Sequence, residues 1–162
     1  MKTNLPLRGR FVFEHWRNGI LLAQMDFPNG ITVEGKNDNL DAYFRNQTQP
    51  TNWYLGLIDA TGYTALSEND TMSSHAGWTE LTAYNEATRP EWAPDAASSK
   101  SITNATARDF TINASKTIKG GFVVSNNTKA GTSGILWATA LAAADINVSA
   151  TDVLKVTYTV NT

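Results

Sequence analysis

The chain begins with two strand-like runs on either side of a turn signal. One run extends from Phe11 to Trp16 and the other from Ile20 to Phe27, and both mix apolar and polar side chains at strand length. Between them stands Asn18-Gly19, and Asn-Gly flanked by such runs is the strongest short-range signal for a β-hairpin. The pattern therefore predicts two antiparallel strands.

The C-terminal half continues in strand-length segments. In DVLKVTYTVN, from Asp152 to Asn161, apolar residues alternate with Lys and Thr, which predicts a strand with one solvated face. By contrast TNWYLGLID, from Thr51 to Asp59, is largely apolar and predicts a strand that is buried on both faces. Further candidate strands, bounded mainly by Gly, Asn or Ser, are WTELTAY, KSITNA, DFTINA, TIKGGFVVS, GILWATAL and INVSA.

One segment has a helical period instead. Leu40, Tyr43 and Phe44 fall at positions i, i+3 and i+4, which predicts a short amphipathic helix near residues 34–46. The Ala-rich stretch from Ala138 to Asp145 is a weaker helix candidate. Eight to ten strands with one short helix predict an all-β fold, a single β-sandwich with a jelly roll as the favoured topology. We expect residues 1–10 to form an N-terminal arm and residues 11–162 the sandwich domain.

A long irregular section from Thr61 to Lys100 interrupts the strands, and loops of this length usually carry function or contacts. Its large aromatic residues either fix the loop to the sandwich or dock into a partner. The apolar residues of the arm likewise either cover the domain's own sheet or reach a neighbour. Trp53 and Trp137 lie inside apolar runs and are expected in the core. The candidate interface residues are Leu5, Leu7, Trp78, Tyr84, Arg89 and Trp92.

Composition and charge limit the kinds of site and partner that we expect for the chain. The 162 residues include no cysteine, so disulfides and thiolate sites are excluded. A net charge of -2 without a Lys or Arg run predicts no nucleic-acid partner. The two histidines, His15 and His75, lack metal-ligand spacing, and we expect neither a metal nor another cofactor. No long apolar run or secretory signal is present, which predicts a protein made in the cytosol without a membrane partner.

The stretch ENDTMSSHAGW has the residue types of a catalytic triad in Asp70, Ser73, Ser74 and His75. Triad members usually come from separate elements that meet in space, and no nucleophile-elbow motif surrounds either serine. We therefore expect a polar loop in which Ser and Asp side chains bind backbone amides, and a protein that is not an enzyme.

Several motifs, taken as a set, resemble a known family: NGITVEGKNDNLDAYFRNQTQPTNWYLGLID, GYTALSENDTMSSHAGWTELTAY, RPEW and LKVTYTV. The chain resembles small structural proteins of tailed bacteriophages, most closely from Asn29 to Tyr84. The resemblance implies a virion component built on a β-sandwich, with a capsid decoration or cement protein as the favoured role. It brings no catalytic residues with it.

The resemblance also implies partners and a location. The expected partners are the major capsid protein and further copies of the chain, as a dimer or trimer, in a virion protein made in the host bacterial cytoplasm. The alternative is a neck, tail or fibre-associated protein that contacts host glycans through exposed tryptophans. A small glycan hydrolase ranks third.

Overall fold

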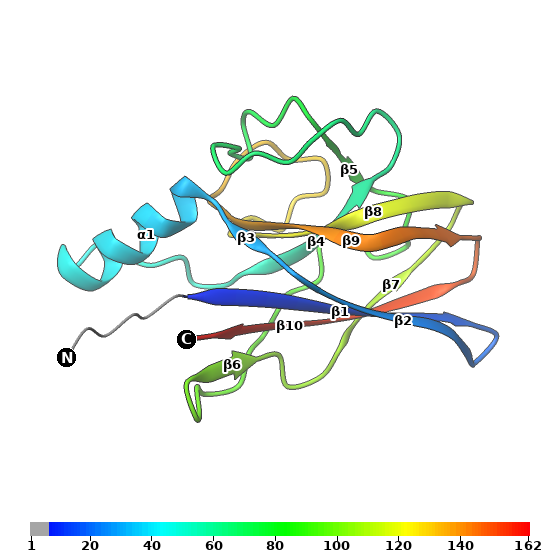
Figure 1. Cartoon of the computed structure of the whole chain (residues 1–162), viewed down its shortest axis with the longest axis horizontal. Helices are drawn as coiled ribbons and strands as arrows, with labels where there is room; N and C mark the ends of the chain where they lie inside the picture. Colours follow the sequence, from blue (N-terminus) through cyan, green and yellow to red (C-terminus); the bar gives the residue numbers. More distant parts are fainter. Residues whose placement is uncertain (1–6) are drawn as a thin grey trace.

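A computed structural model describes residues 7–162 as two antiparallel β-sheets with one helix (Figure 1). One sheet has the order β2-β1-β10-β6, with β7 also paired to β10, and we call it the first sheet. The other, the second sheet, has the order β3-β9-β8-β4-β5. The elements are β1 (Arg8–Arg17), β2 (Ile20–Pro28), β3 (Gly30–Ile31), α1 (Val33–Phe44), β4 (Tyr54–Asp59), β5 (Thr79–Leu81), β6 (Ser101–Thr103), β7 (Arg108–Thr111), β8 (Lys116–Val124), β9 (Leu136–Val148) and β10 (Val153–Asn161).

The predicted all-β sandwich with one short helix is confirmed. The strand order does not confirm a jelly roll, which stays a prediction. The predicted hairpin is also confirmed, because β1 pairs with β2 through Asn18 and Gly19. Their φ angles of 50° and 77° are those of a type I′ turn. Strand β1 begins at Arg8, so the end of the predicted arm belongs to the first sheet.

The first sheet has one buried and one more exposed face, as the alternation in β10 predicts. Leu154, Val156, Tyr158 and Val160 are buried, while the residues between them are partly exposed. The buried face packs against the second sheet in a single apolar cluster that includes side chains from both sheets. The core thus lies between the sheets.

The middle of the second sheet, in β4 and the second half of β8, is buried on both faces. Leu55 and Leu57 of β4 join the cluster between the sheets, whereas Ile58 joins a separate cluster. That outer cluster also holds Phe122 of β8 and is closed by Met72 and Trp78 from the irregular section. The prediction that β4 is buried on both faces is therefore confirmed, and the irregular section supplies the outer cover.

The Ala-rich stretch forms part of a strand, not a helix. GILWATAL and INVSA, predicted as two strands, join through this stretch into the single strand β9. Burial is continuous from Leu136 to Ala140, as in a strand covered on both faces, and Leu141 is then exposed between the buried Ala140 and Ala142. Tertiary packing therefore decides the structure of a segment whose composition favours a helix.

Replacing Trp78 with Ala should lower the free energy of unfolding by about 3–5 kcal/mol, because the indole is the largest side chain of the outer cluster. Denaturant unfolding followed by circular dichroism measures this loss. Tyr43→Ala is the matched control, since that ring is 83% exposed, and should change stability by less than about 0.5 kcal/mol. Equal losses in the two variants would contradict the assignment of Trp78 to the core.

Candidate functional site

The structure buries four of the six candidate interface residues. Trp78, Tyr84 and Arg89 are each about 1% exposed and Trp92 is 7% exposed, so their side chains are not available to a partner. Their assignment as interface residues is therefore wrong for this structure, and the alternative of packing within the chain holds. Leu7 is 37% exposed, whereas Leu5 lies outside the described residues.

Trp78 is the centre of the loop that contains the triad-like residues. Its indole Nε1 donates to Asp70 Oδ2 at 3.0 Å, and the same carboxylate oxygen accepts from the Ser67 amide at 2.9 Å. The His75 ring stacks on the indole at 4.0 Å, and His75 Nδ1 donates to the Trp78 carbonyl oxygen at 3.0 Å. Asp70 and His75 thus hold Trp78 in place, and neither is hydrogen-bonded to a serine hydroxyl in the described structure.

Arg89 forms a buried ion pair with Glu80. The guanidinium donates to both carboxylate oxygens, at 2.9 and 2.7 Å, and also to the carbonyl oxygens of Asn126 and Gly131. Glu80 accepts a further bond from the Ala130 amide. These bonds tie β5 and the irregular section to the connection between β8 and β9, and this structural role accounts for the burial of both charges.

Tyr84 is buried by contacts within the chain. Its ring packs edge-on against Phe110, and Lys129 Nζ lies 4.0 Å from the ring centroid and donates to the Tyr84 carbonyl oxygen. The Tyr84 hydroxyl is buried without a hydrogen-bond partner among residues 7–162. Burial raises the pKa of this hydroxyl, which keeps it protonated.

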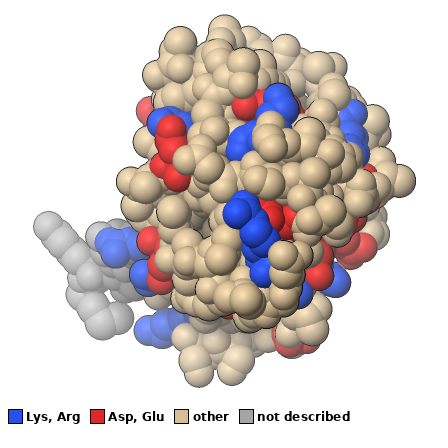
Figure 2. All heavy atoms as spheres, turned by 90° about the vertical axis from the view of Figure 1, so that its right-hand side faces the viewer, with Lys and Arg blue, Asp and Glu red and all other residues tan. Residues whose placement is uncertain are grey.

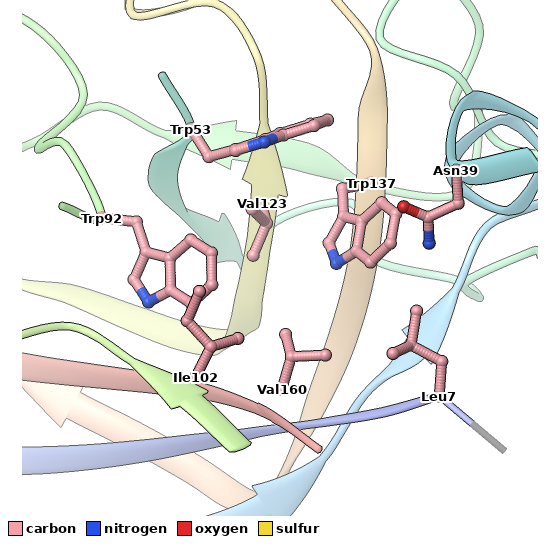
Figure 3. Close-up of a pocket in the computed structure, with 8 residues that line it drawn as sticks. All are labelled: Leu7, Asn39, Trp53, Trp92, Ile102, Val123, Trp137 and Val160. Atoms are coloured by element: carbon pink, nitrogen blue, oxygen red, sulfur yellow. The ribbon is translucent and has the colours of Figure 1, made fainter. Parts of the chain in front are cut away.

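Three tryptophans line a cavity of about 220 Å³ between the sheets, on the side of α1 (Figure 3). Trp92 Nε1 donates to the Tyr158 carbonyl oxygen and Trp137 Nε1 to the Tyr158 hydroxyl, so both indole N–H groups are satisfied internally. The cavity is smaller than most sites for drug-sized ligands and fits a group the size of one apolar side chain. Its lining residues are Leu7, Asn39, Trp53, Trp92, Ile102, Val123, Trp137 and Val160.

A second group of titratable residues surrounds the turn between β9 and β10. Asp152 is fully buried and lies 2.7 Å from His15 Nε2. Arg17 donates to both oxygens of the carboxylate, and the Ser149 amide donates to one of them. These bonds, with Arg17 as the largest cause, hold the pKa of the Asp152 carboxyl well below its usual range. A carboxylate with this many donors acts as a structural clamp on the turn.

The outer face of α1 is the most prominent exposed apolar feature of the described chain. We define this face by Val33, Leu40, Tyr43 and Phe44, whose side chains are 36%, 56%, 83% and 75% exposed. The Tyr43 and Phe44 rings pack edge-to-face at 5.0 Å. Three of these side chains are the residues whose spacing predicts an amphipathic helix, yet they point to solvent.

The helix is turned with its small and polar residues toward the sandwich. The helix packs on β9 through Gly35, its one buried residue, while Asn39 and Ala42 are only partly exposed. A Cβ atom at Gly35 would collide with the Trp137 carbonyl oxygen, so glycine permits the close approach. Thr32 caps the helix by accepting from the Gly35 amide at 3.0 Å.

Other surfaces offer less to a partner. On the face drawn in Figure 2, basic and acidic residues are interleaved, and no basic area collects there. Among residues 7–162, no group of three or more His, Cys, Asp or Glu side chains is placed to hold a metal ion. No helix in the described part of the chain has the length and apolar character needed to cross a membrane.

Comparisons with known proteins do not identify the chain. A scan against protein-family models gives no match, and a search of curated proteins gives no significant one. The resemblance to bacteriophage structural proteins therefore stays a prediction.

Sequence reasoning found the helix but did not predict that its apolar face is exposed. The spacing of Leu40, Tyr43 and Phe44 defines an apolar face, and the usual inference is that such a face packs on the core. The composition of the opposite face could have shown that the apolar face is exposed, because Gly35, Asn39 and Ala42 offer little apolar area to bury. Asp152 was also missed, because its partners His15 and Arg17 lie far away in sequence.

Acid should weaken the turn clamp. A carboxyl with a lowered folded-state pKa stabilises the fold above its unfolded pKa, near 4, and this contribution is lost as pH falls through the folded pKa. Asp152→Asn should therefore lower the free energy of unfolding by about 2 kcal/mol at pH 7. Below about pH 5 the free energy of unfolding should decrease less with falling pH in this variant than in the wild type. Denaturant unfolding across this range measures both effects.

Asp109→Asn is the control for the clamp. The Asp109 carboxylate pairs with Lys155 at the surface, and exposed pairs contribute about 0–1 kcal/mol. If the free energy of unfolding of Asp152→Asn depends on pH as that of the wild type does, the role of Asp152 as a clamp is contradicted.

Proposed function

We propose that the protein is a structural component of a tailed-bacteriophage virion, a capsid decoration or cement protein that stabilises the shell by protein-protein contacts. The observation that carries the contact role is the outer face of α1, where large apolar side chains project into solvent. The virion setting comes from the motif resemblance.

The outer face of α1 has the character of a docking element. An aromatic residue contributes about 150–250 Å² when fully buried, so the exposed parts of Tyr43, Phe44 and Leu40 reach the size of patches that mark interaction sites. An apolar helix face that docks into a groove of a partner is a recurrent recognition mode. Exposed aromatic anchors are also the residues that dominate binding energy at interfaces.

A cement protein stabilises a shell through thermodynamic linkage between its binding and shell assembly. A protein that binds the assembled shell, and not the separate subunits, shifts the equilibrium toward the shell. This role needs contact surface and a rigid frame, and it needs no reacting groups. The glycan-contacting alternative was argued from Trp78 and Trp92, and burial of both rings removes those residues as sugar platforms.

Binding to undecorated phage heads tests the proposal. The purified protein should co-sediment with the heads and raise their resistance to heat and to chelator. Leu40→Lys and Phe44→Lys should each weaken binding at least about tenfold, because a charge enters the apolar contact while the helix propensity stays favourable.

Leu141→Lys is the matched control, since this leucine of β9 is 44% exposed and lies outside α1. It should bind like the wild type. Failure to bind heads, or binding only to neck, tail or fibre preparations, would contradict the cement role. Equal losses in Leu40→Lys and Leu141→Lys would contradict the role of α1.

A further inference from the structure

The cavity of about 220 Å³ between the sheets has walls built largely of indole rings (Figure 3). Trp92 and Trp137 lie on opposite sides of this space, and Trp53 lies across it from Ile102 and Val160. The three tryptophans come from the irregular section, from β9 and from the residue before β4. Segments that are distant in sequence therefore build one aromatic pocket.

The pocket has a buried inner wall and a rim that is open to solvent. Val123, Trp92 and Trp137 are buried and form the inner wall. Leu7 is 37% exposed and Asn39 is partly exposed, and both line the same cavity. A flat protein surface does not reach the inner wall through such a rim, but a small molecule or a single projecting ring does.

Hydrogen bonds within the chain hold the walls in place. Trp92 Nε1 donates to the Tyr158 carbonyl oxygen at 2.8 Å, and Trp137 Nε1 donates to the Tyr158 hydroxyl at 3.2 Å. The Trp53 carbonyl oxygen accepts from the Trp92 amide at 2.8 Å. The ring centroids of Trp53 and Trp137 are 5.7 Å apart, with 55° between the ring planes. The pocket is thus preformed, which lowers the entropic cost of binding.

The helix leaves the space unfilled. The side chain of α1 that lines the cavity is Asn39, which lies beside Trp137 in Figure 3, whereas Leu40 is 56% exposed. Gly35, where the helix approaches β9 most closely, has no side chain to contribute. An apolar space without an occupant lowers the stability of a fold, so a ligand that matches the walls binds favourably.

The lining determines the chemistry of the ligand. None of the eight lining residues is charged, so a charged ligand would lose its hydration without gaining a partner. The single side-chain amide, on Asn39, offers too few polar partners for a sugar with several hydroxyl groups. Apolar cavities of about 150 Å³ hold one benzene molecule. Aromatic rings also gain more than aliphatic groups from edge-to-face and offset contacts with indoles.

We propose that this cavity is a binding site for one uncharged aromatic ring. The ring enters between Leu7 and Asn39 and packs against the three indoles, and a hydroxyl or N–H group on the ring pairs with the Asn39 amide. A free small molecule and an aromatic side chain that projects from another protein present the same chemistry. The site does not depend on a virion role.

Titration of the full chain with phenol, followed by NMR of the tryptophan indole N–H groups, tests the site. The signals of the three cavity tryptophans should shift and reach saturation. The chain contains five tryptophans, so the other two are internal controls. Trp78 lies in the outer cluster and Trp16 donates to Glu14, and neither signal should shift. Equal shifts in all five signals, or none in the cavity tryptophans, overturn the proposal.

Two compounds that match phenol in size test the chemistry. Cyclohexanol keeps the hydroxyl group but lacks the aromatic ring, and its dissociation constant should be at least about twofold higher. Benzoate keeps the ring but carries a charge, and should bind at least about tenfold more weakly than phenol. If either compound binds as tightly as phenol, the proposed chemistry is overturned.

A variant that fills the cavity tests its location independently. Ile102→Phe should raise the dissociation constant of phenol at least about tenfold, because the larger side chain occupies the space. Ile20→Phe makes the same change at a residue of β2 that is 65% exposed, and should bind phenol like the wild type. Equal affinities in the two variants contradict the site. If Ile102→Phe does not fold, the titration of the wild type still decides.

A capped peptide with one phenylalanine distinguishes the two sources of the ring. If the peptide shifts the same three indole signals, the rim admits a ring that is attached to a polypeptide. If only phenol does so, the site takes free small molecules. None of these measurements involves phage heads, so they test the site apart from the cement role.

Leu5→Ala tests whether the chain fills its own cavity. Leu5 lies outside the described residues, two positions before Leu7 at the rim. The wild type and this variant should bind phenol with similar affinity. Phenol binding by Leu5→Ala and not by the wild type assigns the cavity to the N-terminal segment of the chain itself, and overturns the proposal.

Discussion

The need to cover both faces of the second sheet is the constraint on which the rest of the structure depends. One face meets the first sheet, and the other carries Ile58 and Phe122 outward, where they would contact water without a further layer. The irregular section supplies this layer through Met72 and Trp78. Because residues 60–78 form no strand, polar side chains such as Asp70 must satisfy the donors of this cover, including the Trp78 indole.

The buried pair of Arg89 and Glu80 orders the loops beside this cover. A guanidinium with 0% side-chain exposure is tolerated only where its donors find acceptors, and here they reach the carboxylate and two loop carbonyl oxygens. Specificity of loop placement is a better account of the pair than added stability, because two well-packed apolar residues could stabilise the core as well. The pair joins segments that are distant in sequence, so the loops of the outer cover are ordered together.

Sequence reasoning predicts correctly the features that are determined by interactions between residues close together in the chain. The hairpin at Asn18-Gly19, the alternation of β10 and the continuous apolar run of β4 are local patterns, and the structure confirms all three. The helix was also found, but periodicity defines a face without saying what that face meets. Burial of Trp78, Tyr84, Arg89 and Trp92 depends on contacts between distant segments. The same holds for the clamp of Asp152 by His15 and Arg17.

The internal demands of the fold are met without the outer face of α1. The core between the sheets, the outer cluster and the two buried charge groups include none of the four side chains that define this face. Apolar side chains on such a surface contribute little to the stability of a monomer and favour association. The outward turn of the helix is therefore the feature of the fold that the proposed contact role explains and that packing within the chain does not.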